Sequence, residues 1–238
     1  MEISLSKRMQ AVANLMKPAK VACDVGCDHG YVSIYLVKSG VCGKMIAMDV
    51  RQGPLSQAKL HVEEAGLGDY IETRLSDGLH GLRPGECDAM ICAGMGGKLM
   101  VRILEEGQKK IEGMDQMILQ PQSDIAFVRN YLYKQGLTIE EEDMVLEDGK
   151  FYPMMRVVRK KPDLMQSQPL QQKYGPVLLD RGHPVLLAYL RKQKTTYERI
   201  KEQLLENGGN CIRLQEIEKE LIETQETIAR VMERGYNG

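Results

Sequence analysis

Short apolar runs alternate with longer helical stretches through the first 160 residues, and this order constrains the fold more than any other feature of the chain. The early runs are almost continuously apolar, as in parallel strands that are buried on both faces. The predicted strands are residues 20–24, 45–49, 70–75, 88–92, 116–120, 137–146 and 151–158. The predicted helices are residues 6–16, 31–38, 53–64 and 98–110. A β-α-β-α order predicts an α/β, doubly wound, Rossmann-like sheet.

The last two predicted strands are joined through Asp148 and Gly149. Two strands that follow one another across so short a connection form an antiparallel hairpin. We therefore expect a seven-stranded, mostly parallel sheet that ends in a C-terminal β-hairpin.

The pattern changes after Arg159. Residues 161–183 contain Lys-Pro, Gln-Pro and Gly-Pro pairs and are interpreted as a linker. Two heptad series follow, Leu186, Leu190, Gln193, Tyr197, Ile200, Leu204 and then Leu214, Ile217, Leu221, Thr224, Ile228, Val231. A Gly208-Gly209 turn separates them, and their opposite faces are almost wholly charged, which argues against two ordinary core helices. We predict a domain at 1–160 and an antiparallel α-helical coiled-coil hairpin at 184–238, with arms about 30 Å long.

Composition excludes several classes of protein. The 238 residues carry a formal net charge of -1, which argues against a uniformly basic nucleic-acid-binding surface. The six cysteines form no C-x-x-C pair and the four histidines are scattered, so we expect no metal site and reduced, structural thiols. No apolar stretch is long enough for a membrane helix and no signal sequence is apparent, which predicts a cytoplasmic protein.

The turn after the first strand reads DVGCDHG, residues 24–30. Its second glycine comes four positions after the first, whereas a dinucleotide fingerprint has glycine at the fifth position, which is Tyr31 here. The D-x-G-x-x-x-G pattern resembles the first motif of class I S-adenosylmethionine methyltransferases. That cofactor carries cationic amino and sulfonium groups and no pyrophosphate, so Asp24 is the expected partner of its amino group.

Further polar residues follow the next strands. Asp49 closes the second strand, where a carboxylate can accept both ribose hydroxyls, although it could instead cap the helix near Pro54. Residues 76–78, Ser-Asp-Gly, follow the third strand, where this fold places an acidic residue on the adenine amino group, although Asp-Gly is also a plain turn. Ala93-Gly94-Met95 follows the fourth strand and lacks the Asn and the aromatic residue of exocyclic-amine methyltransferases.

Several segments together are more specific. The sequences DVGCDHGYVSIYL, AMDVRQGPLSQA, ICAGMGGKLMVRIL, LQPQ and GKFYPMMRV, with the C-terminal hairpin, resemble the bacterial tRNA (adenine-22-N1)-methyltransferase family, TrmK. The resemblance spans essentially the whole chain. It implies methyl transfer from S-adenosylmethionine to N1 of an adenine in tRNA, yielding S-adenosylhomocysteine, and a coiled coil that helps to hold tRNA.

The residues expected to contact the cofactor are Asp24, Gly26, Cys27, Asp28, His29, Gly30, Asp49, Val50, Ser76, Asp77, Gly78, Ala93, Gly94 and Met95. Asp28 stands where the usual motif has glycine. We assign it a catalytic role, stabilising the positive charge that develops on the methylated base, with a helix N-cap as the alternative. His29 could steer the base, bind cofactor or simply bond to the backbone.

Basic residues are the candidate tRNA contacts. Near the expected pocket these are Lys7, Arg8, Lys98 and Arg102, with Gln120 beside them unless residues 120–122 form a tight turn. On the first arm of the hairpin they are Arg191, Lys192, Lys194, Arg199 and Lys201. Each of these could equally be a solvated cation paired with glutamate on its own helix.

Three other functions compete with an RNA methyltransferase. A small-molecule methyltransferase, or one for another RNA, would use the hairpin for dimerisation. A non-catalytic RNA-binding adaptor would have no need of Asp24, Asp49 and Asp77 at successive strand ends. A dehydrogenase is disfavoured by the glycine spacing. Nothing in the sequence indicates an obligate protein partner.

Overall fold

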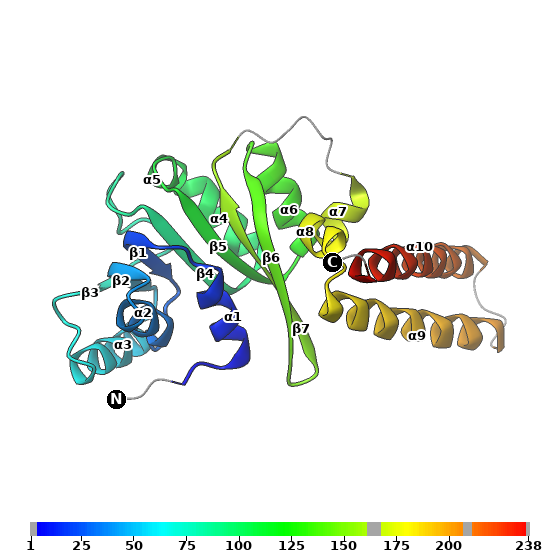
Figure 1. Ribbon diagram of the computed structural model, residues 1–238, viewed down its shortest axis with the longest axis horizontal. Helices are drawn as coiled ribbons and strands as arrows, with labels where there is room; N and C mark the ends of the chain where they lie inside the picture. Colours follow the sequence, from blue (N-terminus) through cyan, green and yellow to red (C-terminus); the bar gives the residue numbers. More distant parts are fainter. Residues whose placement is uncertain (1–3, 161–167, 207–210, 237–238) are drawn as a thin grey trace. The chain divides into compact units, whose positions relative to one another are not determined.

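The computed structural model describes residues 4–160, 168–206 and 211–236 and divides into two compact units (Figure 1). The N-terminal unit is Met1–Lys173 and the C-terminal unit is Tyr174–Gly238. Each is described by itself below.

A seven-stranded sheet forms the centre of the N-terminal unit, with the strand order β3-β2-β1-β4-β5-β7-β6. The strands are β1 (Ala19–Val25), β2 (Cys42–Asp49), β3 (Ile71–Leu75), β4 (Ala89–Gly96), β5 (Gln116–Ser123), β6 (Thr138–Glu147) and β7 (Lys150–Val158). The first five are mutually parallel, and β7 runs antiparallel to both β5 and β6. The predicted mostly parallel sheet with a terminal hairpin is confirmed.

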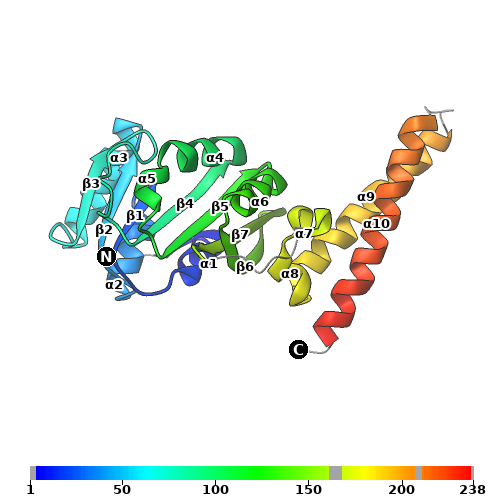
Figure 2. The same ribbon diagram turned by 90° about the horizontal axis from the view of Figure 1, so that it is seen from above.

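Helices cover both faces of this sheet. They are α1 (Lys7–Leu15), α2 (Tyr31–Lys38), α3 (Gln52–Glu64), α4 (Gly97–Glu106), α5 (Gln108–Ile111) and α6 (Ile125–Lys134). One buried cluster joins the sheet to α4, α5 and α6, and a second joins it to α1, α2 and α3. Figure 2 shows α4 and α6 on one side of the sheet and α1 and α2 on the other. Successive side chains of a strand point to opposite faces of the sheet, so Ala22 of β1 belongs to one cluster and Cys23 to the other.

The hairpin turn forms at the predicted residues. Asp148 and Gly149 both have positive φ, 48° and 73°. Two successive residues in this conformation make the turn whose twist matches that of paired antiparallel strands. The register runs from Glu147 opposite Lys150 to Thr138 opposite Val158.

The C-terminal unit contains α8 (Pro176–Asp180), α9 (Pro184–Glu206) and α10 (Cys211–Tyr236). α9 and α10 lie side by side and run antiparallel (Figure 2). Every residue of the two predicted heptad series is buried or half-buried, and Leu190, Thr224 and Val231 are fully buried. The predicted Gly-Gly turn lies outside the described residues.

The predicted linker requires a correction. Part of it, residues 161–167, lies outside the described residues, but α7 (Pro169–Tyr174) and α8 occupy much of the rest. Tyr174, Leu178 and Leu179 are almost completely buried, and α8 packs against α10. The C-terminal unit therefore begins at Tyr174 rather than at Pro184, because these apolar side chains are part of its core.

Candidate active site

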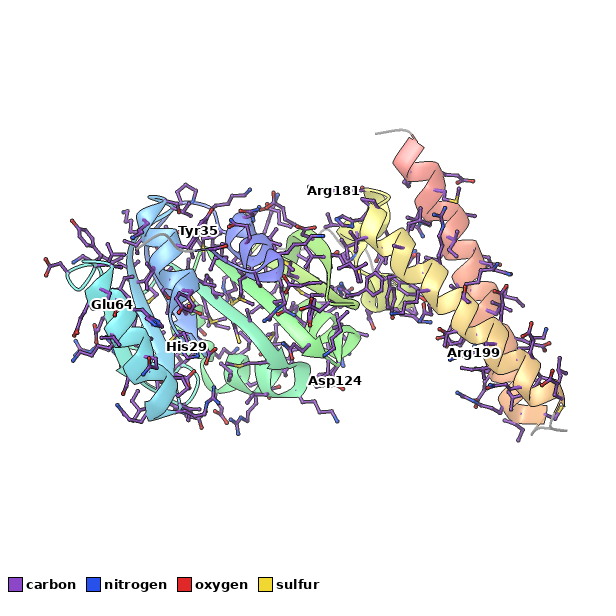
Figure 3. All side chains as sticks on the ribbon, turned by 90° about the horizontal axis from the view of Figure 1, so that it is seen from below. His29, Tyr35, Glu64, Asp124, Arg181 and Arg199 are labelled. Carbon is purple, nitrogen blue, oxygen red and sulfur yellow. The ribbon has the colours of Figure 1, made fainter. Side chains whose placement is uncertain are left out.

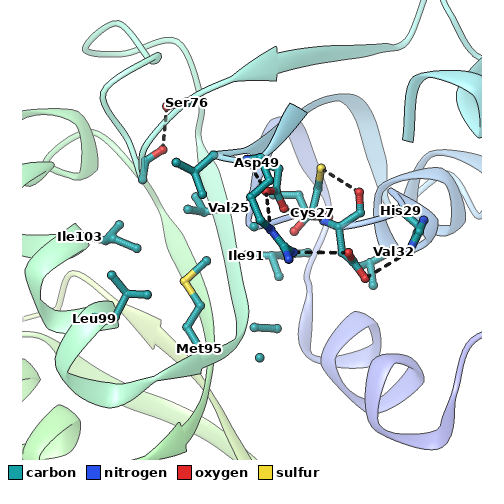
Figure 4. Close-up of a pocket in the computed structure, with 18 of the residues that line it drawn as sticks. Val25, Cys27, His29, Val32, Asp49, Ser76, Ile91, Met95, Leu99 and Ile103 are labelled. Carbon is teal, nitrogen blue, oxygen red and sulfur yellow. Dashed lines mark hydrogen bonds and ion pairs between the residues drawn. The ribbon is translucent and has the colours of Figure 1, made fainter. Parts of the chain in front are cut away.

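A cavity of about 660 Å³ opens at the carboxyl ends of the parallel strands in the N-terminal unit (Figure 4). Residues from the ends of β1, β2 and β4 and from the loop after β3 line it, together with side chains of α1 and α4. Ligands of open α/β sheets bind at this edge, where loops of both faces meet. The position therefore identifies the cavity as the candidate active site.

Asp24, near the end of β1, lies in the floor of the cavity and is 5% exposed. One of its carboxylate oxygens accepts a hydrogen bond of 2.8 Å from the Ser33 hydroxyl on α2. Burial raises the pKa of Asp24 to about 6; the Ser33 hydrogen bond opposes this shift and the nearby charge of Asp49 adds to it. Burial disfavours the ionised form of this carboxyl group, and a cationic partner would stabilise it.

Asp49, at the end of β2, is also buried and holds two loops in place. Its Oδ2 accepts the backbone N–H of Asp28 at 3.2 Å, and its Oδ1 accepts that of Arg51 at 2.8 Å. α3 begins after Arg51 and has no side-chain cap, so the alternative role of Asp49 as the cap near Pro54 is not observed. The Arg51 Nε also lies 3.6 Å from Oδ1, an ion pair just beyond hydrogen-bond distance. An ionised carboxylate has about four acceptor positions, so two remain for a ligand.

Asp28 lies at the rim, with its side chain 60% exposed. Its backbone is left-handed, with φ of 51°, a conformation that Asp and Asn adopt more readily than most residues. Its carboxylate oxygens lie 3.7 Å from the Arg51 guanidinium and 3.8 Å from Nε2 of His29. The N-cap alternative for Asp28 is wrong, because Gly30 is the N-cap of α2 and no side chain bonds there.

The glycine turn and the end of β4 pack closely across the cavity. Gly26 has φ of 75°, and a Cβ there would overlap the terminal methyl group of Met95. The Met95 sulfur lies 3.6 Å from Sγ of Cys92. The register between β4 and β5 shifts on both sides of Met95, and Gly94 within this bulge has φ of 83°. Bulges of this kind re-aim side chains next to active sites.

Gln120 connects three parts of the cavity wall, although its own side chain is fully buried. Its Oε1 accepts hydrogen bonds from Nη1 of Arg8 at 2.9 Å and from the backbone N–H of Gly94 at 3.1 Å. The Arg8 guanidinium also lies over the Tyr152 ring, 5.2 Å from its centroid. The tight-turn alternative is wrong, because these residues continue β5 to Ser123.

The loop after β3 is both a turn and part of the cavity wall. The Ser76 hydroxyl donates to the Gly78 carbonyl at 2.9 Å and accepts the Gly81 N–H at 2.8 Å. Asp77 lies 3.5 Å from the Arg102 guanidinium of α4. The segment is therefore a turn, and its Asp77 also lines the cavity, so the turn and the expected cofactor contact are compatible.

The structure brings the expected cofactor residues together with one exception. The cavity is lined by Asp24, Gly26, Cys27, Asp28, His29, Asp49, Val50, Ser76, Asp77, Gly78, Ala93, Gly94 and Met95. Gly30 is absent from the lining because it faces α3, where a Cβ would lie 3.1 Å from that of Ala58.

Only some of the residues expected to contact tRNA lie at the cavity. Arg8 and Arg102 line the cavity, whereas Lys7, Lys98 and Gln120 do not. The five cations of the hairpin, Arg191, Lys192, Lys194, Arg199 and Lys201, all lie on α9. Lys194 pairs with Glu198 on the same helix at 3.0 Å, and Lys201 pairs with Glu218 of α10 at 2.8 Å. Lys194 thus has the partner on its own helix that the alternative interpretation requires, whereas the partner of Lys201 lies on the other helix of the hairpin.

Sequence reasoning missed several lining residues, among them Arg51, Tyr31 and Leu99, whereas Gln122 lines the cavity as one interpretation of residues 120–122 expected. Arg51 follows the strand-end Asp49 by two positions, a signal that could have placed it at the same edge. Leu99 and Ile103 are four apart on α4, and both face the cavity (Figure 4). Tyr31 opens α2 directly after the glycine turn.

Within the described part of the chain, no group of three or more His, Cys, Asp or Glu side chains is arranged to hold a metal ion. No described helix is both long and apolar enough to cross a membrane. Five of the six cysteines are buried, as expected of structural residues, whereas Cys211 is exposed.

Comparisons with known proteins agree with this geometry. A family described as "Methyltransferase domain" matches residues 5–155. The tRNA (adenine(22)-N(1))-methyltransferase of Bacillus subtilis is 33% identical over 237 residues, which cover 98% of this chain and 99% of that protein. A Streptococcus pneumoniae protein solved with S-adenosyl-L-methionine has a TM-score of 0.82 and 31% identity, covering 94% of this chain and 100% of that one. The TrmK of M. capricolum, solved with S-adenosyl-homocysteine, has a TM-score of 0.82 and 25% identity over 95% and 99% of the two chains.

Proposed function

Because this chain belongs to the tRNA (adenine(22)-N(1))-methyltransferase family, we propose that it transfers the methyl group of S-adenosylmethionine to N1 of adenine 22 in tRNA. The product of the cofactor is then S-adenosylhomocysteine. We also propose a cytoplasmic location, because tRNA is found there.

The two buried carboxylates at the ends of β1 and β2 are the observation that carries this proposal. Asp24 offers a desolvated negative charge to the cofactor's amino group, and Asp49 has acceptor positions left for the ribose hydroxyls. Asp77 is assigned to the adenine amino group. The absence of a Cβ at Gly26 keeps the backbone open beside Met95. Dinucleotide sites also use a carboxylate at the end of the second strand, so Asp24 is the group that discriminates: its buried charge beside the glycine turn disfavours a pyrophosphate and suits the cationic amino group of S-adenosylmethionine.

When bound, S-adenosylmethionine supplies an electrophilic methyl group on its sulfonium. The N1 atom of adenine carries an in-plane lone pair, so this chain needs no base to remove a proton first. The protein mainly aligns N1 with the methyl group, and a fixed attack geometry can lower the activation barrier by roughly 7–11 kcal/mol. Asp28, exposed at the rim, is assigned to stabilise the positive charge that the methylated base acquires.

The cationic side chains at the cavity are the residues that we assign to RNA binding. Arg8 and Arg102 line the cavity beside the aspartates and are assigned to the RNA backbone, because arginine binds phosphate through several N–H groups at once. The target base must be unpaired or turned outward, because N1 lies on its pairing edge. The cations of α9 support a role for the C-terminal unit in holding tRNA, with the N-terminal unit as the catalytic domain.

Labelled methyl transfer tests the proposal. The protein is incubated with S-adenosylmethionine and bulk tRNA lacking this modification, and the RNA is digested to nucleosides. We expect label in 1-methyladenosine that maps to position 22. Label on another nucleoside would contradict the position, and label on a small molecule alone would favour the alternative in which the hairpin serves dimerisation. Calorimetry is expected to show micromolar-class binding of S-adenosylmethionine and none of NAD.

A further inference from the structure

Three aromatic rings meet at the rim of the cavity, where α2 and α3 approach each other. The Tyr31 ring stacks on that of His61, with centroids 4.7 Å apart and an interplanar angle of 21°. The His29 ring lies 6.1 Å from Tyr31 and 6.0 Å from His61. Figure 3 shows His29 beside these two helices. Tyr31 and His29 line the cavity, and His61 supports Tyr31 from α3.

Hydrogen bonds fix the orientation of the Tyr31 ring. Nδ1 of His61 lies 3.0 Å from the His29 carbonyl oxygen, which can only accept, so this nitrogen carries the proton. In the neutral imidazole Nε2 is then an acceptor, and the Tyr31 hydroxyl donates to it at 3.4 Å. His61 thus covers one face of Tyr31 and holds its edge, so little freedom is lost when another ring packs against it.

Tyr31 is nevertheless 40% exposed, although its ring is stacked and hydrogen-bonded on one side. An exposed aromatic face beside an RNA-methylating site is suited to a nucleobase, because every base has a π-face and single-stranded or splayed-out bases stack on Tyr and His. The cofactor's adenine is assigned to a different element, the loop after β3 that carries Asp77.

We propose that Tyr31, supported by His61, is a stacking position for a base of the tRNA substrate next to the methyl-transfer site. This inference rests on the proposed function and adds to it a residue that binds RNA through a base rather than through a phosphate. Because stacking does not depend on charge, this contact resists salt, whereas the phosphate contacts of Arg8 and Arg102 weaken as salt rises.

The first test compares variants of Tyr31 in the full chain. We expect Tyr31→Leu to raise the KM for tRNA about tenfold to a hundredfold while the Kd for S-adenosylmethionine stays within about twofold. Tyr31→Phe, which keeps the ring, should recover most of the loss. Tyr70→Leu is the matched control, because Tyr70 is 50% exposed but precedes β3, at the opposite edge of the sheet. An unchanged KM in Tyr31→Leu, with the protein folded and binding cofactor, would overturn the inference.

The second test uses the absence of tryptophan from this chain. Tyr31→Trp introduces a single fluorescent reporter, and tRNA added in the presence of S-adenosylhomocysteine should quench it by stacking, whereas Tyr70→Trp should respond little. Quenching by S-adenosylhomocysteine alone, without further change on adding tRNA, would make Tyr31 a cofactor contact and overturn the inference. If the unmodified protein methylates no tRNA, it is the proposed function that fails, so the two failures are distinguishable.

Discussion

At the scale of single residues, Asp24 links the fold to the proposed binding of cofactor. Its burial raises the pKa to about 6, so the carboxyl begins to take up a proton just below neutral pH. If the ionised form binds the cofactor's amino group, the Kd for S-adenosylmethionine should rise as pH falls below 6, by up to about tenfold per pH unit. Calorimetric titrations between pH 7.5 and pH 5 measure this. A Kd that does not change with pH would contradict the assignment.

Asp24→Asn provides the matched variant and a second readout. The folded-state pKa of Asp24 lies above its unfolded value of about 3.9, so the ionised residue costs the native state free energy that is absent below pH 4 and complete above pH 6. Asparagine can still accept from Ser33, so we expect this variant to be about 1–3 kcal/mol more stable than the parent at pH 8 in urea unfolding. The gain should shrink as pH falls toward 5, and cofactor binding should be weak at every pH.

Asp28 permits a kinetic test of charge stabilisation. Asparagine tolerates the left-handed backbone of this position, so Asp28→Asn should keep the loop and leave cofactor affinity nearly unchanged. We expect single-turnover methylation at saturating cofactor to fall about tenfold to a hundredfold, which corresponds to roughly 1.4–2.7 kcal/mol. An unaltered rate would remove Asp28 from the catalytic assignment. Lost cofactor affinity with an unchanged rate would mean that Asp28 binds the cofactor and does not stabilise charge on the base.

At the scale of elements, sequence patterns predicted every strand and the hairpin turn, because apolar runs and Asp-Gly are local signals. The predicted ends of elements were wrong where packing between distant segments sets those ends. β4 extends to Gly96, past its predicted end at residue 92, because the bulge at Met95 pairs irregularly with β5. The predicted helix at 98–110 breaks at Gly107, where a Cβ would overlap Leu79. Arg51 and Tyr31 adjoin predicted site positions, but their contacts with Asp28 and with His61 are made between segments that meet only in the folded chain.

The end of the N-terminal unit is held by one buried ion pair. Arg129 of α6 and Glu142 of β6 are each 3% exposed, and their nearest charged atoms are 2.8 Å apart. Nη1 of Arg129 also donates to the carbonyls of Gln172 and Lys173, at 3.1 Å and 3.2 Å. This arginine therefore attaches the last helical turn before the C-terminal unit to the catalytic sheet.

We expect Arg129→Ala to destabilise the protein by about 3–5 kcal/mol, because it leaves the Glu142 carboxylate buried without its cation. Urea unfolding measures the change. Arg129→Met together with Glu142→Met removes both charges and should recover much of the lost stability. A single variant that unfolds at the same urea concentration as the parent would show that the pair contributes nothing.

At the scale of the whole molecule, the two units divide the work that the proposed function requires. The cavity is lined entirely by residues of the N-terminal unit, and its sheet is closed by the β6–β7 hairpin. The C-terminal unit has its own buried seam, in which Leu186, Leu190 and Val231 are almost completely buried. Each unit thus has a core, so removing one should not expose the interior of the other.

A chain that ends at Lys173 tests this division. The cut lies at the observed boundary and keeps Gln172 and Lys173 for Arg129. A cut at the sequence-predicted boundary of residue 184 would instead leave the buried Tyr174, Leu178 and Leu179 without α9 and α10, the helices that their segment contacts. We expect the shortened protein to fold and to bind S-adenosylmethionine with a Kd within about twofold of the full chain, because every lining residue remains. Methylation of tRNA should fall steeply through a higher KM, since the α9 cations are lost. Full activity in the shortened protein would confine the coiled coil to another role, such as dimerisation, and lost cofactor binding would show that the two units do not fold independently.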